Sequence, residues 1–186
     1  MKRLLIITAI ILLAIPCRAE VILTTSTEYY PVDGIGKNEI LKNLKKEAPQ
    51  KKGKEYFPAY TQTGIKYEYS WGKRKGRCDV TKATVYLNLT YVYPRLARTQ
   101  DKRTRTWWEE TLKKYEIHEK IHGKISRRSA NELDKKLNSL KNLDCNRAKE
   151  TISARAKYII RQMRKRQEEY DRVTKHGRKQ EKYRDY

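Results

Sequence analysis

Two histidines at positions 118 and 122, with a glutamate directly after the first, are the residues of this 186-residue chain best suited to chemistry. The segment is His118-Glu119-Lys120-Ile121-His122, the pattern H-E-x-x-H. Residues four apart lie on one face of a helix, so both imidazoles can bind one zinc ion. In zinc peptidases a glutamate so placed takes a proton from the activated water. The motif predicts that His118 and His122 bind Zn²⁺ and that Glu119 is the general base.

A long helix, predicted from about residue 103 to about residue 140, carries the motif. Its apolar residues form one stripe that includes His122, with Glu119 near the centre and His118 at the edge. A carboxylate on an apolar face is costly unless it is paired. Gly123 costs about 0.5–1 kcal/mol relative to alanine in a helix interior, which indicates that something approaches the backbone closely there. These features favour a buried functional site over an exposed polar helix in which two histidines fall four apart by chance.

The hydrophobic patterns predict an α+β fold. A small, mainly antiparallel sheet would pack against an antiparallel hairpin of two long helices, the first being a zincin-like active-site helix. Apolar and polar residues alternate over 65–71 and 85–93, and residues 21–30 are rich in Val, Thr and Tyr, all as expected for strands. The other predicted elements are a short helix from 37 or 38, a basic loop over 49–58, a strand end at Pro94, a turn over 142–146 and a second long helix over 147–173.

A catalytic zinc ion usually has three protein ligands and a water molecule, so a third ligand is needed. The third histidine of the chain is His176. If the helices turn near residue 144, the second helix returns to the level of the motif at about residues 166–170, at about 1.5 Å per residue. His176 lies beyond that level and needs a bend, which Gly177 permits. We predict His176 as the third ligand, with Glu168, Glu169 and Asp171 as rivals.

Two side chains of the second helix at the level of the motif, Asp171 and Tyr170, are predicted to support the site. Asp171, if it is not a ligand, could orient a zinc-binding imidazole through a hydrogen bond. Tyr170 could donate a hydrogen bond to the oxyanion of the transition state, and we count it with Glu119 as a catalytic candidate.

The first nineteen residues have the pattern of a signal peptide. Lys2 and Arg3 precede an apolar run over 4–16, which is too short for a comfortable membrane span, and Ala19 supplies a small residue for cleavage. We expect cleavage after Ala19, a single zinc-peptidase-like domain over 20–186, and a periplasmic or secreted protein. The alternative is a lipoprotein acylated on Cys17.

Cleavage would leave Cys78 and Cys145 in an oxidising compartment. An even pair in that setting predicts one disulfide bond between them. The alternative is two buried free thiols.

The chain is strongly basic, with a net charge of +22. The leader contains three of these charges and no acid, so the remainder would have a net charge of +19. Such a surface favours anionic partners, here envelope polymers or a lipid surface, while nucleic acid is not expected. The densest basic clusters lie at 51–54 and 73–77.

Several blocks of the sequence resemble a bacterial family of predicted secreted zinc-dependent proteases, otherwise a domain of unknown function. The matching blocks are Tyr29–Gly34, Ala59–Thr61, Cys78 with the strand after it, His118-Glu119 and His122, Cys145 and Tyr170–Gly177. The resemblance implies an exported metallopeptidase with His118 and His122 as zinc ligands and His176 as the matching third. Lys120 stands where an uncharged residue is expected, at a position predicted to point outward.

The leading hypothesis is therefore an exported zinc metallopeptidase that hydrolyses peptide or protein substrates. The alternative is a catalytically silent, zinc-containing module that binds the anionic envelope through its basic surface. A third hypothesis is a purely structural helical hairpin without metal.

Overall fold

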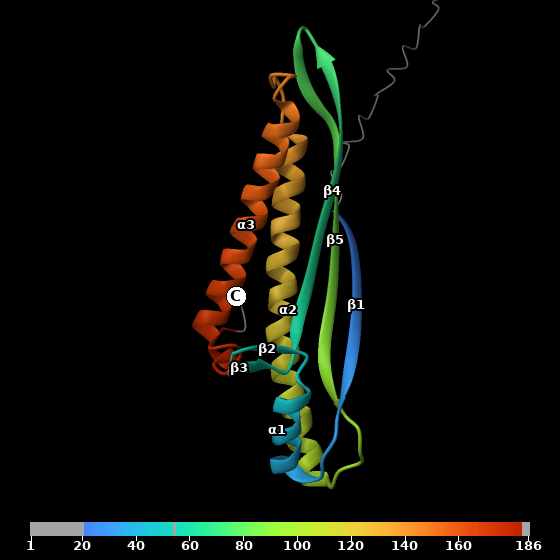
Figure 1. The fold of residues 1–186 in the computed structure, drawn as a ribbon, viewed down its shortest axis with the longest axis vertical. Coiled ribbons are helices and arrows are strands. Elements are labelled where there is room, and N and C mark those ends of the chain that lie inside the picture. The colour runs from blue at the N-terminus through green and yellow to red at the C-terminus, as the bar shows by residue number, and fades with distance from the viewer. Residues whose placement is uncertain (1–20, 54, 184–186) are drawn as a thin grey trace, which may run out of the picture.

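The computed structural model describes residues 21–53 and 55–183, so the predicted signal peptide and Cys17 lie outside the described residues. The fold is α+β, as predicted (Figure 1). The elements are β1 (Val21–Val32), α1 (Gly36–Glu47), β2 (Gln50–Lys52), β3 (Glu55–Phe57), β4 (Tyr60–Arg74), β5 (Arg77–Leu96), α2 (Lys102–Asn138), α3 (Ala148–Thr174) and the short 3₁₀ helix η1 (Gln180–Tyr183).

The main sheet has the strand order β1-β5-β4 and is mixed. β4 and β5 form an antiparallel hairpin, whereas β1 pairs with β5 in parallel. The prediction of a mainly antiparallel sheet is therefore correct only for the hairpin. The physical reason is that β5, the last strand in the chain, occupies the centre and runs in the same direction as β1.

Two local predictions were wrong. The segment predicted as a basic loop contains the small antiparallel hairpin β2–β3. Strand β5 continues past Pro94 to Leu96, although proline was expected to end it. Pairing with β4 stops at Val92, so one side of β5 is free at Pro94 and its missing N–H does not interrupt that ladder.

Helix α2 lies against one face of the β4–β5 hairpin, and α3 packs alongside α2 on the side away from the sheet (Figure 1). The alternating residues of β5, among them Val85 and Leu87, are fully buried against Leu133 and Leu137 of α2 and Ile152 of α3. This core holds α2 between the sheet on one side and α3 on the other. Side chains of α2 can therefore meet either β4 and β5 or α3, depending on where they lie around the helix.

Beyond α3 the chain turns back on itself, as the sequence predicted for Gly177. Lys175 and His176 adopt positive φ angles of 50° and 52°, and Gly177 follows with 81°. The reversal brings η1 against both α2 and α3.

A disulfide bond between Cys78 and Cys145 ties β5 to the turn between α2 and α3, which confirms the predicted pairing. A backbone bridge between Cys78 and Leu143 reinforces it. The bond is consistent with an exported protein. In the described part of the chain, no helix combines the length and the apolar character that crossing a membrane requires.

Candidate metal centre

The three motif residues are buried in the middle of α2. The exposed fractions are 6% for His118, 4% for Glu119 and 9% for His122. The two imidazoles face α3, while the Glu119 carboxylate faces strand β4. The predicted inward orientation is confirmed, and Lys120 is exposed and pairs with Glu116, as its outward position requires.

A carboxylate from α3 meets both imidazoles. Asp171 Oδ1 lies 3.1 Å from His118 Nε2 and 3.0 Å from His122 Nε2. The two Nε2 atoms lie 3.2 Å apart. Within the described residues these three side chains form a group that could hold a metal ion.

Two glutamines engage the other nitrogen of each imidazole. His118 Nδ1 lies 2.9 Å from Gln180 Oε1 of η1, and His122 Nδ1 is hydrogen-bonded to Gln167 Oε1 of α3. The Gln167 amide nitrogen donates to the His122 carbonyl and to Ser126 Oγ, which fixes the orientation of its side chain. The glutamine oxygens can only accept, so each Nδ1 must donate its proton.

This hydrogen bonding decides what the opposite nitrogens can do. In a neutral imidazole whose Nδ1 donates, Nε2 bears a lone pair. Two such lone pairs and a carboxylate oxygen therefore converge on one point. The arrangement needs a positive charge at that point, either a proton or a metal ion.

The spacing fits a metal ion well. In a tetrahedral zinc site with bonds of about 2.0–2.1 Å, neighbouring ligand atoms lie about 3.3 Å apart. The three separations of 3.0, 3.1 and 3.2 Å are close to that value. Three protein ligands would leave a fourth position for water or substrate, as catalytic sites do.

The predicted third ligand, His176, lies next to this group but is not part of it. Its Nδ1 is 3.7 Å from Asp171 Oδ1, and its side chain is 41% exposed. Its ring packs edge-on against Phe57, with centroids 5.1 Å apart. Asp171, a rival ligand in the sequence prediction, joins the two histidines in the candidate group, while the neighbouring Glu169 pairs with Arg172.

Tyr170, predicted to stabilise an oxyanion, is fully buried behind the imidazoles. Its ring stacks on His118 with centroids 4.8 Å apart, and it meets His122 edge-on at 5.0 Å. Its hydroxyl donates to Gln180 Oε1 at 2.6 Å. These contacts position the imidazoles. The Tyr170 hydroxyl proton is used in the bond to Gln180 and is not directed at an oxyanion.

Glu119 is held from the sheet side. The hydroxyl of Thr61, near the start of β4, lies 2.8 Å from Glu119 Oε2 and 3.0 Å from the Glu119 carbonyl oxygen. Burial raises the pKa of Glu119, partly offset by the nearby charges of His122 and His118 and by the Thr61 hydrogen bond. A raised pKa makes a carboxylate a stronger base, which suits proton transfer near neutral pH.

The pKa values of the histidine–aspartate pair move in opposite directions. Burial lowers the pKa of His122, but the hydrogen bond to Asp171 and the charges of Glu119 and Asp171 outweigh it and raise the pKa overall. Burial raises the pKa of Asp171, but hydrogen bonds and charge from His118 and His122 bring it well below its usual range. Asp171 is therefore ionised at neutral pH, as a metal ligand must be.

Two glycines allow the close packing around the site. A Cβ on Gly123 would lie 2.0 Å from the hydroxyl oxygen of Tyr91, so only glycine lets the tyrosine approach α2. This is the close approach that the sequence indicated. A Cβ on Gly177 would lie 3.3 Å from His118 Cγ, and the positive φ there also favours glycine.

Sequence reasoning missed Thr61, Gln167 and Gln180 as parts of the site. Gln167 had a detectable signal, because it precedes Asp171 by four residues and so shares its face of α3. Gln180 reaches the site only through the chain reversal at Gly177, and Thr61 only through the packing of β4 on α2.

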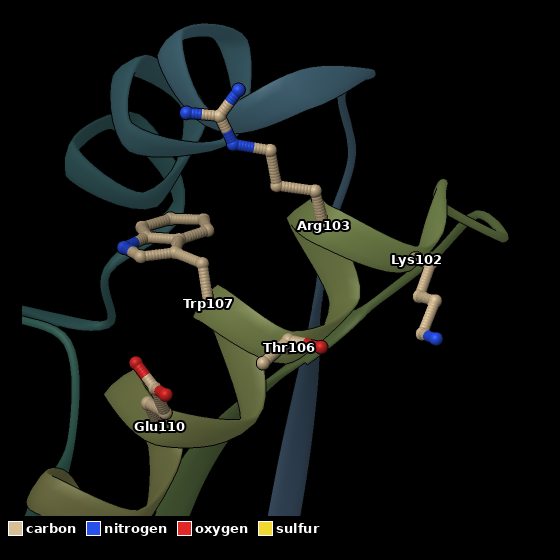
Figure 2. Close-up of a pocket in the computed structure, with 5 residues that line it drawn as sticks. All are labelled: Lys102, Arg103, Thr106, Trp107 and Glu110. Carbon is tan, nitrogen blue, oxygen red and sulfur yellow. The ribbon is translucent and has the colours of Figure 1, made fainter.

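A hollow lies near the start of α2, lined by Lys102, Arg103, Thr106, Trp107 and Glu110 (Figure 2). Lys37 of α1 places its ammonium 5.2 Å from the centre of the Trp107 ring. The side chains of Lys102 and Arg103 point away from each other, so the polar groups do not converge on one point. We assign no site to this hollow.

Comparison with known families places this geometry in context. Residues 27–177 match a family described as "Bacterial protein of unknown function (DUF922)". The chain belongs to this family. All the residues of the candidate centre except Gln180 lie inside the matched range. Neither the search of curated proteins nor the search of solved structures found a match.

Proposed function

We propose that this protein is an exported, zinc-dependent peptidase in which His118, His122 and Asp171 bind the metal and Glu119 is the general base. The observation that carries the proposal is the convergence of two imidazole Nε2 atoms and one carboxylate oxygen, 3.0–3.2 Å apart, beside a buried glutamate on the same helix. Two histidines and one carboxylate are also a ligand set of known zinc peptidases.

A zinc ion bound there would polarise a carbonyl group and make a neighbouring water more acidic. The residues around the centre supply its negative charge and the orientation of its imidazoles. Asp171 is ionised and reduces the net charge of the centre, while Gln167 and Gln180 hold the imidazoles in the tautomer whose Nε2 can bind metal.

Glu119 would accept a proton from the attacking water and pass it to the leaving amine. Its burial raises its affinity for that proton, and the Thr61 hydroxyl holds the carboxylate in one orientation. This division of roles, with metal ligands facing α3 and the base facing β4, follows from the position of α2 between the two layers.

The test combines metal content with hydrolysis of a library of quenched fluorescent peptides. The disulfide-intact protein is expected to contain close to one equivalent of zinc and to cleave part of the library. Glu119→Gln should keep the zinc and lose hydrolysis by about a hundredfold or more, the usual contribution of a general base. Glu116→Gln is the matched control, because Glu116 lies on the same helix and pairs only with the exposed Lys120 among the described contacts.

Each outcome decides between the hypotheses. Retention of hydrolysis by Glu119→Gln would refute the assigned base. Stoichiometric zinc without cleavage of any peptide by the wild-type protein would refute the peptidase and favour the zinc-containing binding module. Absence of zinc after growth in zinc-supplemented medium would refute the metal centre.

A further inference from the structure

The β4–β5 hairpin ends in a concentrated positive charge that the candidate metal centre does not use. Lys73, Arg74, Lys75 and Arg77 lie within five residues that contain no acid, and all four are exposed. We call these four residues the cationic tip. Lys75 and Gly76 make the turn with positive φ angles of 49° and 79°, so the strands reverse as sharply as a two-residue hairpin allows.

The charges of the tip are not neutralised within the molecule. In the described residues, Lys73, Arg74 and Lys75 form neither an ion pair nor a side-chain hydrogen bond. Arg77 donates to the carbonyl and side-chain oxygens of Asn142, which fixes its position and leaves its charge intact. The closest acid along the strand, Asp79, accepts from the backbone of Asn142 instead of pairing with a cation.

An exposed aromatic residue adjoins the cations. Trp71 follows the irregularity between Ser70 and Trp71 in the pairing of β4 with β5, and it is 43% exposed. Tyr67 and Tyr69, which occupy the preceding alternate positions of β4, are half-buried instead. Lys73 lies two residues after Trp71 and so shares its face of the strand. Tryptophan with lysine and arginine is the combination that places a protein at the headgroup level of a membrane.

The tip projects from the molecule on a cross-linked base. Figure 1 shows the hairpin extending beyond the turn between α2 and α3, at the end of the molecule opposite α1. The Cys78–Cys145 disulfide and the Arg77–Asn142 hydrogen bonds tie its base to that turn. Between Thr61 at the candidate centre and Trp71, ten residues of β4 span about 33 Å.

From these observations we propose that the cationic tip and Trp71 bind the surface of an anionic phospholipid membrane. The cations contact phosphate groups, Trp71 lies among the headgroups, and the hairpin holds the candidate centre about 30 Å from the surface. The inference does not depend on the proposed function. Charge favours lipid phosphate, and the exposed tryptophan beside the cations favours a membrane interface over a nucleic acid.

The test is co-sedimentation of the protein from residue 20 onward, without the apolar leader, with two kinds of vesicle. One is pure phosphatidylcholine, and the other is phosphatidylcholine and phosphatidylglycerol in equal parts. We expect binding to the anionic vesicles only, weakening with added salt. Each basic residue near an anionic surface contributes about fivefold to binding, so the variant Lys73→Glu/Arg74→Glu/Lys75→Glu, which also adds repelling charges, should bind at least about a hundredfold more weakly.

A matched variant separates the tip from overall charge. Arg155→Glu/Lys157→Glu/Arg164→Glu changes three exposed cations of α3 and produces the same net charge. It should keep most of the binding, whereas Trp71→Ala, which leaves the charge unchanged, should lose several-fold. Thermal melting confirms that each variant is folded.

The outcomes are distinct. Equal losses in the two triple variants would show a general electrostatic effect and overturn the tip as the docking element. Unchanged binding of Trp71→Ala would overturn the placement of Trp71 among the headgroups, and this result does not rely on the triple variant of the tip. Binding to a double-stranded oligonucleotide, with none to the anionic vesicles at the same salt, would replace the membrane by a nucleic acid and overturn the proposal.

Discussion

Replacement of Asp171 by alanine should weaken zinc binding far more than replacement of His176. The sequence favours His176 as the third ligand, but the structure places Asp171 Oδ1 at 3.0–3.1 Å from both imidazole nitrogens. His176 Nδ1 lies 3.7 Å from the same carboxylate oxygen and is not within the ligand group. The two substitutions therefore distinguish a direct ligand from a neighbour.

The expected magnitudes differ by more than a factor of ten. Zinc held by four ligands is bound with about 10–16 kcal/mol, or about 3 kcal/mol for each ligand, so loss of one should weaken binding by about a hundredfold or more. His176 forms an ion pair with Asp171 only when protonated, and an exposed pair contributes at most about 1 kcal/mol. His176→Ala should therefore weaken zinc binding by less than about tenfold.

The assay is competition for zinc with a chromophoric chelator at constant pH. Asp171→Asn, which preserves the shape of the side chain, shows whether the charge is required. Glu169→Gln is the matched control, because its carboxylate is two residues away and bonded to Arg172. A larger loss for His176→Ala than for Asp171→Ala would refute the assignment of Asp171 and show that the chain end rearranges when metal binds.

Three further predictions address the packing, the charges and the cross-link. Gly123→Ala should lower the free energy of unfolding by about 1–3 kcal/mol, despite the better helix propensity of alanine, because its Cβ would overlap the Tyr91 hydroxyl at 2.0 Å. Tyr91→Phe should recover part of that loss in a double-mutant cycle measured by urea unfolding, and purely additive effects would contradict the clash. In the metal-free protein, the raised pKa of His122 means that its protonated form stabilises the fold. This stabilisation is complete below about pH 6.5 and is lost as the pH rises through the raised pKa of the folded state. The ionised form of Asp171, whose pKa is lowered, stabilises the fold above about pH 3.8. This stabilisation is lost as the pH falls through the lowered pKa of the folded state. The melting temperature of the metal-free protein should thus decrease from pH 6 to pH 8. The rise in melting temperature that zinc produces should become larger over the same range, because zinc and protons compete for the imidazoles. Calorimetry with and without a chelator measures both trends, and a melting temperature of the metal-free protein that does not decrease would contradict the first. Replacing both disulfide cysteines by alanine should cost about 4 kcal/mol, since the cross-link closes a long loop, and an unchanged urea midpoint would argue against that contribution.

Much of this protein follows from patterns that are local in sequence. The helix period around the motif gave both the extent of α2 and the inward face of His118 and His122, because side chains four apart share a face in any helix. The count of two cysteines after the predicted signal peptide indicated one disulfide bond, which is present. Gly123 indicated a close approach before its partner, Tyr91, was known.

The remaining features depend on contacts between segments far apart in the chain. The parallel pairing of β1 arises because β5 lies in the centre of the sheet, and no local pattern of β1 encodes its neighbour. Length arithmetic along the helical hairpin could bring residues 166–171 to the level of the motif, but it could not show which side chain points at the metal position. The rotation of α3 and the reversal at Gly177 decided that.

The sequence by itself thus determined the helix α2, the inward face of its two histidines and its glutamate, and the cross-link, because helix periodicity and residue counts are properties of the chain alone. The tertiary structure alone decided which carboxylate meets the two imidazoles. Asp171 contacts both imidazoles because α3 packs against α2, and Gln180 bonds to His118 because the chain folds back after α3.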